Sequence, residues 1–375
     1  MIKHLFILFA TFLTSFHSPY YFAQEIAILP YCNKPIHARG IAIKYLLLLL
    51  FVSLQLPSFF AQKIAILPYC NKPIHARGIA VKGHFIYLGN NNGEVIRYDL
   101  KNGKSKSLNA KDTFPEIRDI ALHKHSIYAM QSADYSCIIK FSRFGNAMKR
   151  INLITLELEP QLFLDGMAIE NNEGFVMGDP VGNKFSLFHS NDLKHWERIT
   201  PALPSFDGEA GFAASGSTVQ IRNGVYYFVS GGEKSRFFRS KDKGQTWIQS
   251  ELPFKKSNAS GAFSLAMKDT NNGIVVGGDY LAPNSRENVC FITKDGGITW
   301  NASTSGPFGY RSCVYYTDGV YYSCGTNGID YSKDNGTTWI QLSNENCFSL
   351  CSDNKFVYAS STNGRILRIS KVSFN

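Results

Sequence analysis

The chain has 375 residues and a formal net charge of +10 at pH 7. Aromatic residues make up 14% of the sequence and charged residues only 18%, a composition that suits a packed β-protein and excludes an intrinsically disordered chain. The basic residues are scattered, with no run longer than two, so the sequence gives little support to nucleic-acid binding.

The N-terminus resembles a secretory signal peptide. Residues 1–24 combine a basic start, an apolar run at 5–16 and a cleavage region ending in Phe-Ala-Gln. We therefore expect export to the periplasm or the extracellular space.

The segment after the signal is duplicated. Residues 22–42 recur almost letter for letter at 60–80, with a second signal-like run between the copies. Two signals serve no single export event, so we interpret this as a duplicated 5′ end and predict three parts: a signal peptide (1–24), a duplicated segment (25–62) and a folded domain (63–375). The alternative is a membrane anchor at 45–56, but its apolar run is about a dozen residues against the roughly 20 of a comfortable span.

A repeat of roughly 40–50 residues runs from residue 74 to the C-terminus. Its units open with short runs such as RGIA (77–80), RDIA (118–121) and DGMA (165–168), and the others open at residues 211, 263, 311 and 348. Each unit gives three or four short strand-like runs with polar turns, and no stretch after residue 62 has a helical period. The sequence predicts an all-β fold, a seven-bladed β-propeller of four-stranded blades.

The seventh unit lacks an outer strand. The segment 64–67 (IAIL) is a good candidate to supply it and to close the ring by pairing the two ends of the domain. The duplicated segment 26–29 would then be a redundant copy for the same place.

Three turns share the residue types serine or threonine, aspartate, glycine, threonine and tryptophan, and a fourth, one residue shorter, lacks the glycine and the threonine. The full copies are SKDKGQTW (240–247), TKDGGITW (293–300) and SKDNGTTW (332–339), and SNDLKHW (190–196) is a shortened copy. Each is predicted to join two antiparallel strands, with glycine supplying a positive φ and the carboxylate and hydroxyls bonding the backbone. The tryptophan opens the outgoing strand and buries its ring. The predicted structural residues are Asp192, Trp196, Asp242, Gly244, Trp247, Asp295, Gly297, Trp300, Asp334, Gly336 and Trp339; the alternative is that these carboxylates are catalytic or bind metal.

Cys313 and Cys324 flank an aromatic run containing Asp318-Gly319. A two-residue hairpin turn there would place the two cysteines opposite each other, within reach of a disulfide. Export would permit that disulfide, and the alternative is a pair of buried thiols. No cysteine or histidine group has a telling metal-ligand spacing and no cofactor motif is present, so we expect neither a metal nor a cofactor.

The residues that open the innermost strands meet at one mouth of a propeller's channel. The guanidinium group of arginine can donate two parallel hydrogen bonds to one carboxylate. This set of residues therefore predicts an anion or carboxylate site, for example for an acidic protein tail. The alternative is a ring of mutually neutralising salt bridges, with turn capping as the role of the loop residues. The predicted mouth residues are Arg77, Arg118, Asp165, Glu209 and Arg311, with Asp279, Tyr280 and Tyr310 in neighbouring loops.

The aspartate-containing turns resemble the Asp-box (BNR) repeat. The segments GEAGFAAS (208–215), GGDY (277–280), GYRS (309–312) and GIDYS (328–332) resemble, more specifically, the photosystem II assembly/stability factor-like propellers, bacterial members of which often carry the label oxidoreductase. The resemblance covers residues 74–369 and implies an exported scaffold that docks on membrane-protein partners or their assembly intermediates. We therefore expect a monomeric, non-enzymatic scaffold that binds a protein partner or an acidic ligand, without nucleic acid; the oxidoreductase label has no support in the sequence.

The alternative is a glycoside hydrolase of the sialidase type, in which Asp boxes are common. That resemblance implies that Arg77, Arg118 and Arg311 grip a substrate carboxylate and that Glu209 acts as an acid or base. The Arg-Ile-Pro segment of such enzymes is absent. A tyrosine hydroxyl bonded to a glutamate in the mouth would favour the hydrolase, whereas carboxylates paired with the arginines would count against it.

Overall fold

The computed structural model describes residues 64–109, 114–133, 136–142, 148–151 and 161–372. The predicted signal peptide and duplicated segment lie outside these residues. The described part of the chain consists of strands, turns and loops, and no helix within it is long and apolar enough to cross a membrane.

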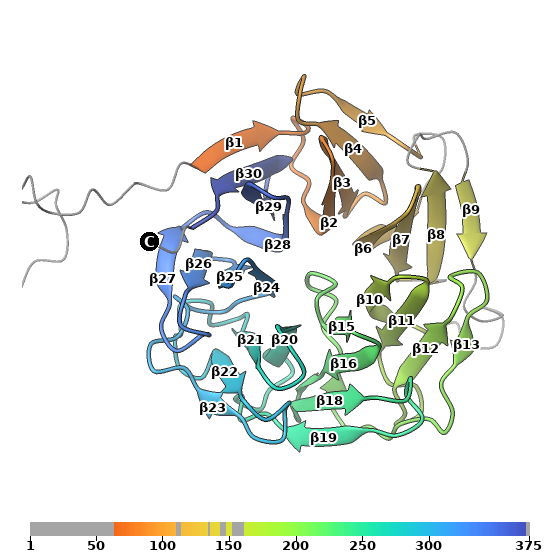
Figure 1. Cartoon of the computed structure of the whole chain (residues 1–375), viewed down its shortest axis with the longest axis vertical. Helices are drawn as coiled ribbons and strands as arrows, with labels where there is room; N and C mark the ends of the chain where they lie inside the picture. Colours follow the sequence, from red (N-terminus) through yellow and green to blue (C-terminus); the bar gives the residue numbers. More distant parts are fainter. Residues whose placement is uncertain (1–63, 110–113, 134–135, 143–147, 152–160, 373–375) are drawn as a thin grey trace, which may run out of the picture. The chain divides into compact units, whose positions relative to one another are not determined.

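The described strands form seven antiparallel blades around one axis (Figure 1), which confirms the predicted seven-bladed propeller. Blade one comprises β2 (Ala76–Lys82), β3 (Phe85–Asn90), β4 (Val95–Asp99) and β5 (Ser105–Ser107). Blade two comprises β6 (Glu116–His123), β7 (Ser126–Ser132), β8 (Cys137–Ser142) and β9 (Met148–Ile151). Blade three comprises β10 (Leu164–Glu170), β11 (Glu173–Gly178), β12 (Ser186–Ser190) and β13 (Glu197–Arg198).

The remaining blades continue this order from the innermost to the outermost strand. Blade four comprises β15 (Val219–Arg222), β16 (Val225–Val229), β18 (Arg236–Ser240) and β19 (Ile248–Glu251). The short strands β14 (Glu209–Ala210) and β17 (Gly231–Gly232) lie along the same part of the chain but extend the sheet of blade five, where β17 pairs with the innermost strand. Blade five comprises β20 (Ser260–Met267), β21 (Gly273–Asp279), β22 (Cys290–Thr293) and β23 (Asn301–Ala302). Blade six comprises β24 (Cys313–Thr317), β25 (Val320–Gly325), β26 (Gly328–Ser332) and β27 (Ile340–Ser343), and blade seven comprises β28 (Cys347–Ser352), β29 (Phe356–Ser361), β30 (Arg365–Ser370) and β1 (Ile64–Pro68).

The second strand of each blade is the most apolar because neighbouring blades cover both of its faces. In β16 (VYYFV) every residue is buried, and in β25 (VYYSCG) every residue is buried as well. Such strands have continuous apolar sequences, whereas the outermost strands are short and exposed. The core therefore lies between the blades, and the channel surface is left to the innermost strands.

The ring is closed by strands from the two ends of the domain. β1 pairs antiparallel with β30, from Ile64 opposite Ile369 to Pro68 opposite Arg365. This confirms the prediction that the segment 64–67 completes the seventh blade.

The four aspartate turns connect the third and fourth strands of blades three to six. In blade four, the Ser240 hydroxyl donates to Asp242 and accepts the backbone N–H of Gly244 at 2.7 Å. Asp242 also accepts the backbone N–H of Thr246 at 2.8 Å, and Gly244 has a φ of 93° that favours glycine. The same bonds recur at Asp295 and Asp334. The tryptophan rings are half-buried except that of Trp339, which is buried.

Blade four corrects one sequence prediction. Residues 211–214 were expected to open its innermost strand, but β14 is followed by a loop, residues 211–218, and the strand resumes only at β15. Because β14 pairs with β17 across from this interruption, the loop is an excursion from within the strand. We call it the central loop. The small residues of GFAASGST allow it to pack where side chains would collide: a Cβ on Gly216 would lie 2.2 Å from Asp119.

Candidate functional site

The central loop projects toward the middle of the ring (Figure 1) and contacts the other six blades. Its Ala213 and Ala214 carbonyl oxygens accept bonds from blades two and one, and a Cβ on Gly166 of blade three would lie 2.9 Å from the Gly216 carbonyl oxygen. Its serines bond to blades five, six and seven. The loop thereby fills the axis of the ring. Its partners in blade order are Arg77, Arg118, Gly166, Ser264, Ser312 and Ser349.

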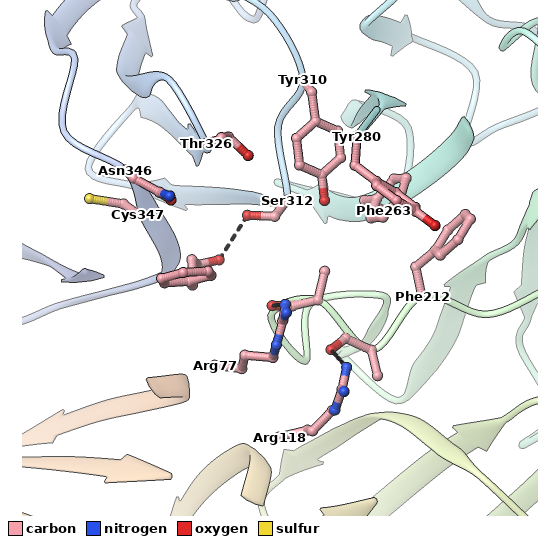
Figure 2. A pocket seen from close by; sticks show the side chains of 13 residues that line it. Arg77, Arg118, Phe212, Phe263, Tyr280, Tyr310, Ser312, Thr326, Asn346 and Cys347 are labelled. Carbon is pink, nitrogen blue, oxygen red and sulfur yellow. Dashed lines mark hydrogen bonds between the residues drawn. The ribbon is translucent and has the colours of Figure 1, made fainter. Parts of the chain in front are cut away.

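A pocket of about 340 Å³ lies on one side of the central loop, at the predicted channel mouth. Phe212, Ala213 and Ala214 of the loop form part of its lining. Figure 2 shows two arginines on one side and an aromatic group on the other. We call these the basic wall and the aromatic wall. The lining residues beyond the loop are Arg77, Arg118, Phe263, Tyr280, Tyr310, Ser312, Thr326, Asn346, Cys347 and Phe348.

The basic wall has two guanidinium groups and one carboxylate. Arg118 contacts Glu116 through Nε at 3.0 Å and Nη2 at 2.7 Å, whereas Arg77 Nε lies 3.7 Å from the same carboxylate. Each arginine also donates to the central loop, Arg77 to Ala214 O at 3.1 Å and Arg118 to Ala213 O at 3.0 Å. The wall therefore carries a net positive charge on groups that are already held in position.

The guanidinium group of Arg77 is largely buried and lies close to a second cation, Arg118. Its pKa is lowered first by burial and then by the charge of Arg118, and its Nε is buried without a hydrogen-bond partner. Burial, followed by the charge of Arg77, also lowers the pKa of His75, whose ring stacks on Phe348 at 4.5 Å. An anion placed here would offset this excess of positive charge.

The aromatic wall is a packed cluster. Phe212 and Phe263 stack with their ring centroids 3.9 Å apart, and Tyr310 meets the edge of Phe263 at 4.8 Å. Tyr280 approaches both Phe263 at 6.2 Å and Tyr310 at 6.5 Å. Burial raises the pKa of Tyr310 further above its usual value. This wall offers apolar surface and ring edges.

The structure separates the predicted mouth residues into two groups. Arg77, Arg118, Tyr280 and Tyr310 line the pocket. Asp279 lies at the base of the Tyr280 loop, where it accepts the Leu281 backbone N–H at 3.0 Å and contacts Lys255 at 3.3 Å. Glu116, which the sequence analysis did not single out, stands two residues before Arg118.

Arg311 does not reach the pocket, which corrects the expectation of three arginines at the mouth. Its side chain is completely buried in blade six, where it pairs with Asp330 and donates to Asn327 at 2.6 Å. A carboxylate was within reach inside the blade, and Arg311 turns toward it. Glu209 is likewise buried, paired with Arg236 at 2.6 Å.

Buried carboxylates hold the base of the central loop. Asp179 accepts the Gly211 N–H at 2.9 Å, and Asp165 lies against Gly211 with one oxygen that has no hydrogen-bond partner. Burial raises the pKa of Asp165 well above its usual value, and the neighbouring Asp179 raises it further. Asp119 accepts N–H groups of Ile120 and Met167, yet burial raises its pKa to about 7. Asp165 thus lies beneath the mouth rather than within the pocket lining.

We expect Asp119→Asn to gain stability relative to the unsubstituted protein as the pH rises. The unfolded carboxyl ionises near 3.8 and the folded one near 7, so between these values the folded state holds a proton that the unfolded state has released. The contribution of Asp119 to the stability of the unsubstituted protein therefore falls through this window, by up to about 1.4 kcal/mol per pH unit. Urea unfolding at the two ends of the window measures the difference.

Asp242→Asn serves as the control, because the hydrogen bonds from Thr246 and Ser240 lower the pKa of exposed Asp242 to about 2. Its stability difference should stay nearly constant above about pH 5, since the carboxylate is ionised there in both the folded and the unfolded state. A pH-independent difference for Asp119→Asn would contradict the assignment of a raised pKa.

Cys313 and Cys324 face each other across the β24–β25 hairpin, in the register that the Asp-Gly turn predicts. Both are buried and carry free thiols in this structure. A hydrogen bond from Cys324 lowers the pKa of Cys313, whereas burial raises that of Cys324.

The mouth does not have the arrangement expected to favour a hydrolase. Glu116 pairs with the two arginines, and Glu209 pairs with Arg236. Such pairing of carboxylates with arginines is the arrangement expected to count against a hydrolase. Among the described residues, the pocket shows no bond between a tyrosine hydroxyl and a glutamate. Within the same residues, no group of three or more His, Cys, Asp or Glu side chains could hold a metal ion.

No family model and no curated protein matches the sequence. Solved structures share its fold. A virginiamycin B lyase from Staphylococcus aureus, solved with quinupristin, has a TM-score of 0.61 at 14% identity, covering 83% of this chain and 100% of that one. YCF48 bound to a D1 peptide has a TM-score of 0.59 at 11% identity, covering 82% and 97%.

The WD40 propeller domain of Doa1 has a TM-score of 0.58 at 11% identity, covering 83% of this chain and 98% of that one. Identities this low show a shared fold alone. The chain is therefore a seven-bladed propeller similar in fold to YCF48, a photosystem II assembly factor.

Proposed function

We propose that this chain is an exported, non-enzymatic scaffold of the Asp-box type that binds a partner protein through a carboxylate at the mouth pocket. One observation carries the proposal: Arg77 and Arg118 share the single carboxylate of Glu116 beside a pocket of about 340 Å³. A second carboxylate, supplied by a partner, would balance the two guanidinium groups.

The geometry of the basic wall suits such a ligand. Arginine presents planar forks of N–H donors that match a carboxylate, and bonds between charged groups are stronger than neutral ones. Glu116 and the central-loop carbonyls already hold both side chains, so binding costs little side-chain ordering. Both side chains remain partly open to solvent, since those of Arg77 and Arg118 are 25% and 23% exposed.

The fold neighbours support a polypeptide partner. YCF48 was solved with a D1 peptide, and its fold covers most of this chain. The predicted signal peptide supports export, and the four aspartate turns support the Asp-box assignment. A membrane-protein assembly intermediate is the partner class that the family resemblance implies.

The proposal is tested with paired peptide libraries. Short amidated peptides on beads carry one fixed Asp in the first library and one fixed Asn in the second, with random neighbours. We expect the labelled protein to retain more Asp beads than Asn beads. Arg77→Ala and Arg118→Ala should each remove most of this preference, since a hydrogen bond to a charged group contributes about 1.5–3 kcal/mol, or roughly 10- to 100-fold.

Arg97→Ala provides the matched control, because Arg97 lies over the ring of Phe85 in blade one and does not line the pocket. It should leave the Asp preference intact. Equal retention of the two libraries by the unsubstituted protein would refute carboxylate recognition.

A further inference from the structure

The pocket continues onto an exposed apolar surface formed by the loop after β21. Leu281 is 76% exposed, more than any other large hydrophobic side chain among the described residues, and Tyr280 is 46% exposed. Tyr280 also lines the pocket, so the exposed surface and the aromatic wall are continuous. We call Tyr280 and Leu281 the apolar shelf.

The apolar shelf is held in place by its own loop. The Leu281 backbone N–H donates to Asp279 Oδ1, and the Ala282 N–H donates to the Asp279 carbonyl at 3.0 Å. Residues of blade six hold the following part of the loop. The Tyr310 N–H and the Asn327 side chain both donate a hydrogen bond to the Pro283 carbonyl, at 3.0 and 3.1 Å. The backbone of Leu281 is therefore fixed directly after Tyr280, a pocket residue, and its apolar side chain is exposed.

The basic wall and the aromatic wall face each other across the pocket (Figure 2). A carboxylate alone would occupy the side of Arg77 and Arg118 and leave the half-buried ring of Phe212 and the exposed ring of Tyr280 in contact with water. Apolar surface released from water is the largest favourable term in most associations, and contiguous exposed apolar surface marks binding sites. The ligand that uses both walls carries an acidic group and a bulky apolar side chain together.

The charge beside the shelf favours the same ligand. The Lys255 side chain is 71% exposed and lies 3.3 Å from Asp279 at the base of the loop. The acidic group of Asp279 is thereby offset, and the partner's negative charge meets no exposed carboxylate at the shelf itself. A purely acidic segment would not use the shelf, and a purely apolar one would not use the arginines.

We infer that the mouth selects partner segments in which an acidic residue stands next to a bulky apolar or aromatic residue, with the apolar side chain seated on Tyr280 and Leu281. This inference rests on the proposed carboxylate recognition and narrows it to one class of peptide. Leu281 sets the apolar preference and the two arginines set the acidic one.

The paired libraries test the inference when the retained beads are sequenced. For the unsubstituted protein, beads from the Asp library should be enriched in Phe, Leu or Trp beside the Asp. Leu281→Ser should lose that enrichment, keep its preference for Asp over Asn, and bind a selected peptide about tenfold more weakly in fluorescence anisotropy. Ile298→Ser is the matched control, because Ile298 is 59% exposed on an aspartate turn and does not line the pocket.

The outcomes separate the two proposals. Asp preference without apolar enrichment, or enrichment that survives in Leu281→Ser, overturns this inference and leaves the proposed function standing. Loss of the Asp preference in the unsubstituted protein overturns the proposed function. Apolar enrichment that is equal in the Asp and Asn libraries overturns this inference as well, because it shows that the apolar contact does not accompany a carboxylate; the proposed function then stands as long as Asp beads are retained more than Asn beads.

Discussion

Arg311→Ala is expected to lower the free energy of unfolding by about 3–5 kcal/mol, the usual cost of removing one partner from a buried ion pair. Arg311 and Asp330 are both completely buried, and no other cation is in contact with Asp330 among the described residues. The substitution would leave that carboxylate in the interior with only the Ser323 hydroxyl and the Phe308 N–H as donors, both at 3.4 Å. Chemical denaturation monitored by tryptophan fluorescence measures the loss.

A double variant and a mouth variant provide the controls. Arg311→Met combined with Asp330→Leu should recover most of the stability, because a buried pair replaced by apolar side chains is often neutral. Arg77→Ala should cost about 1 kcal/mol or less, since the Arg77 side chain is 25% exposed. A small loss for Arg311→Ala would instead place this arginine at the solvent-exposed mouth.

Removing β1 should destabilise the ring by an amount on the order of 3–5 kcal/mol, at about 1 kcal/mol for each backbone hydrogen bond lost. β1 forms five residue pairs with β30, and its loss would expose the apolar strand β30 (RILRIS) along its whole length. The comparison is between a chain that begins at Gln62 and one that begins at Tyr69, measured by urea denaturation.

Both of these shortened chains also lack the duplicated copy of the strand. Residues 26–30 repeat the sequence IAILP of β1, so a longer chain could replace the deleted strand with its copy. A full-length chain that lacks only residues 64–68 is therefore informative as a second comparison. If the Tyr69 chain unfolded at the same urea concentration as the Gln62 chain, strand β1 would contribute nothing to ring closure.

The blade order and the closing strand could be predicted from the sequence because both depend on local patterns. Short runs of period two separated by turns define a blade, and IAILP is an apolar run with no partner in its own repeat. The central loop could not be predicted, because GFAAS has the same small and apolar residues as the opening of an innermost strand. Only the packing of Gly211 against Asp165 and of Gly216 against Asp119 distinguishes it, and these contacts join distant repeats.

Only part of the candidate site could be predicted, again because contacts between distant residues decide the rest. Arg77, Arg118 and Arg311 occupy similar positions in their repeats, but the direction of each side chain depends on which carboxylate it can reach in space. The sequence also contained an indication of aromatic residues at the mouth, but the prediction of the site did not include them. Phe263 and Phe348 open their repeats at the position that the arginines occupy in others, and both line the pocket.

The central loop has a consequence for how the ring opens and closes. Its hydrogen bonds reach the neighbouring and the opposite blades, so the complete set forms only when the last blade has been closed. The N–H groups that it orders, such as that of Leu265 bonded to the Ser217 carbonyl at 2.9 Å, can exchange with solvent only when the ring as a whole opens. Surface loops exchange early, but the amides that this loop orders should exchange among the last of the protein, so their exchange rate reports the integrity of all seven blades in one measurement.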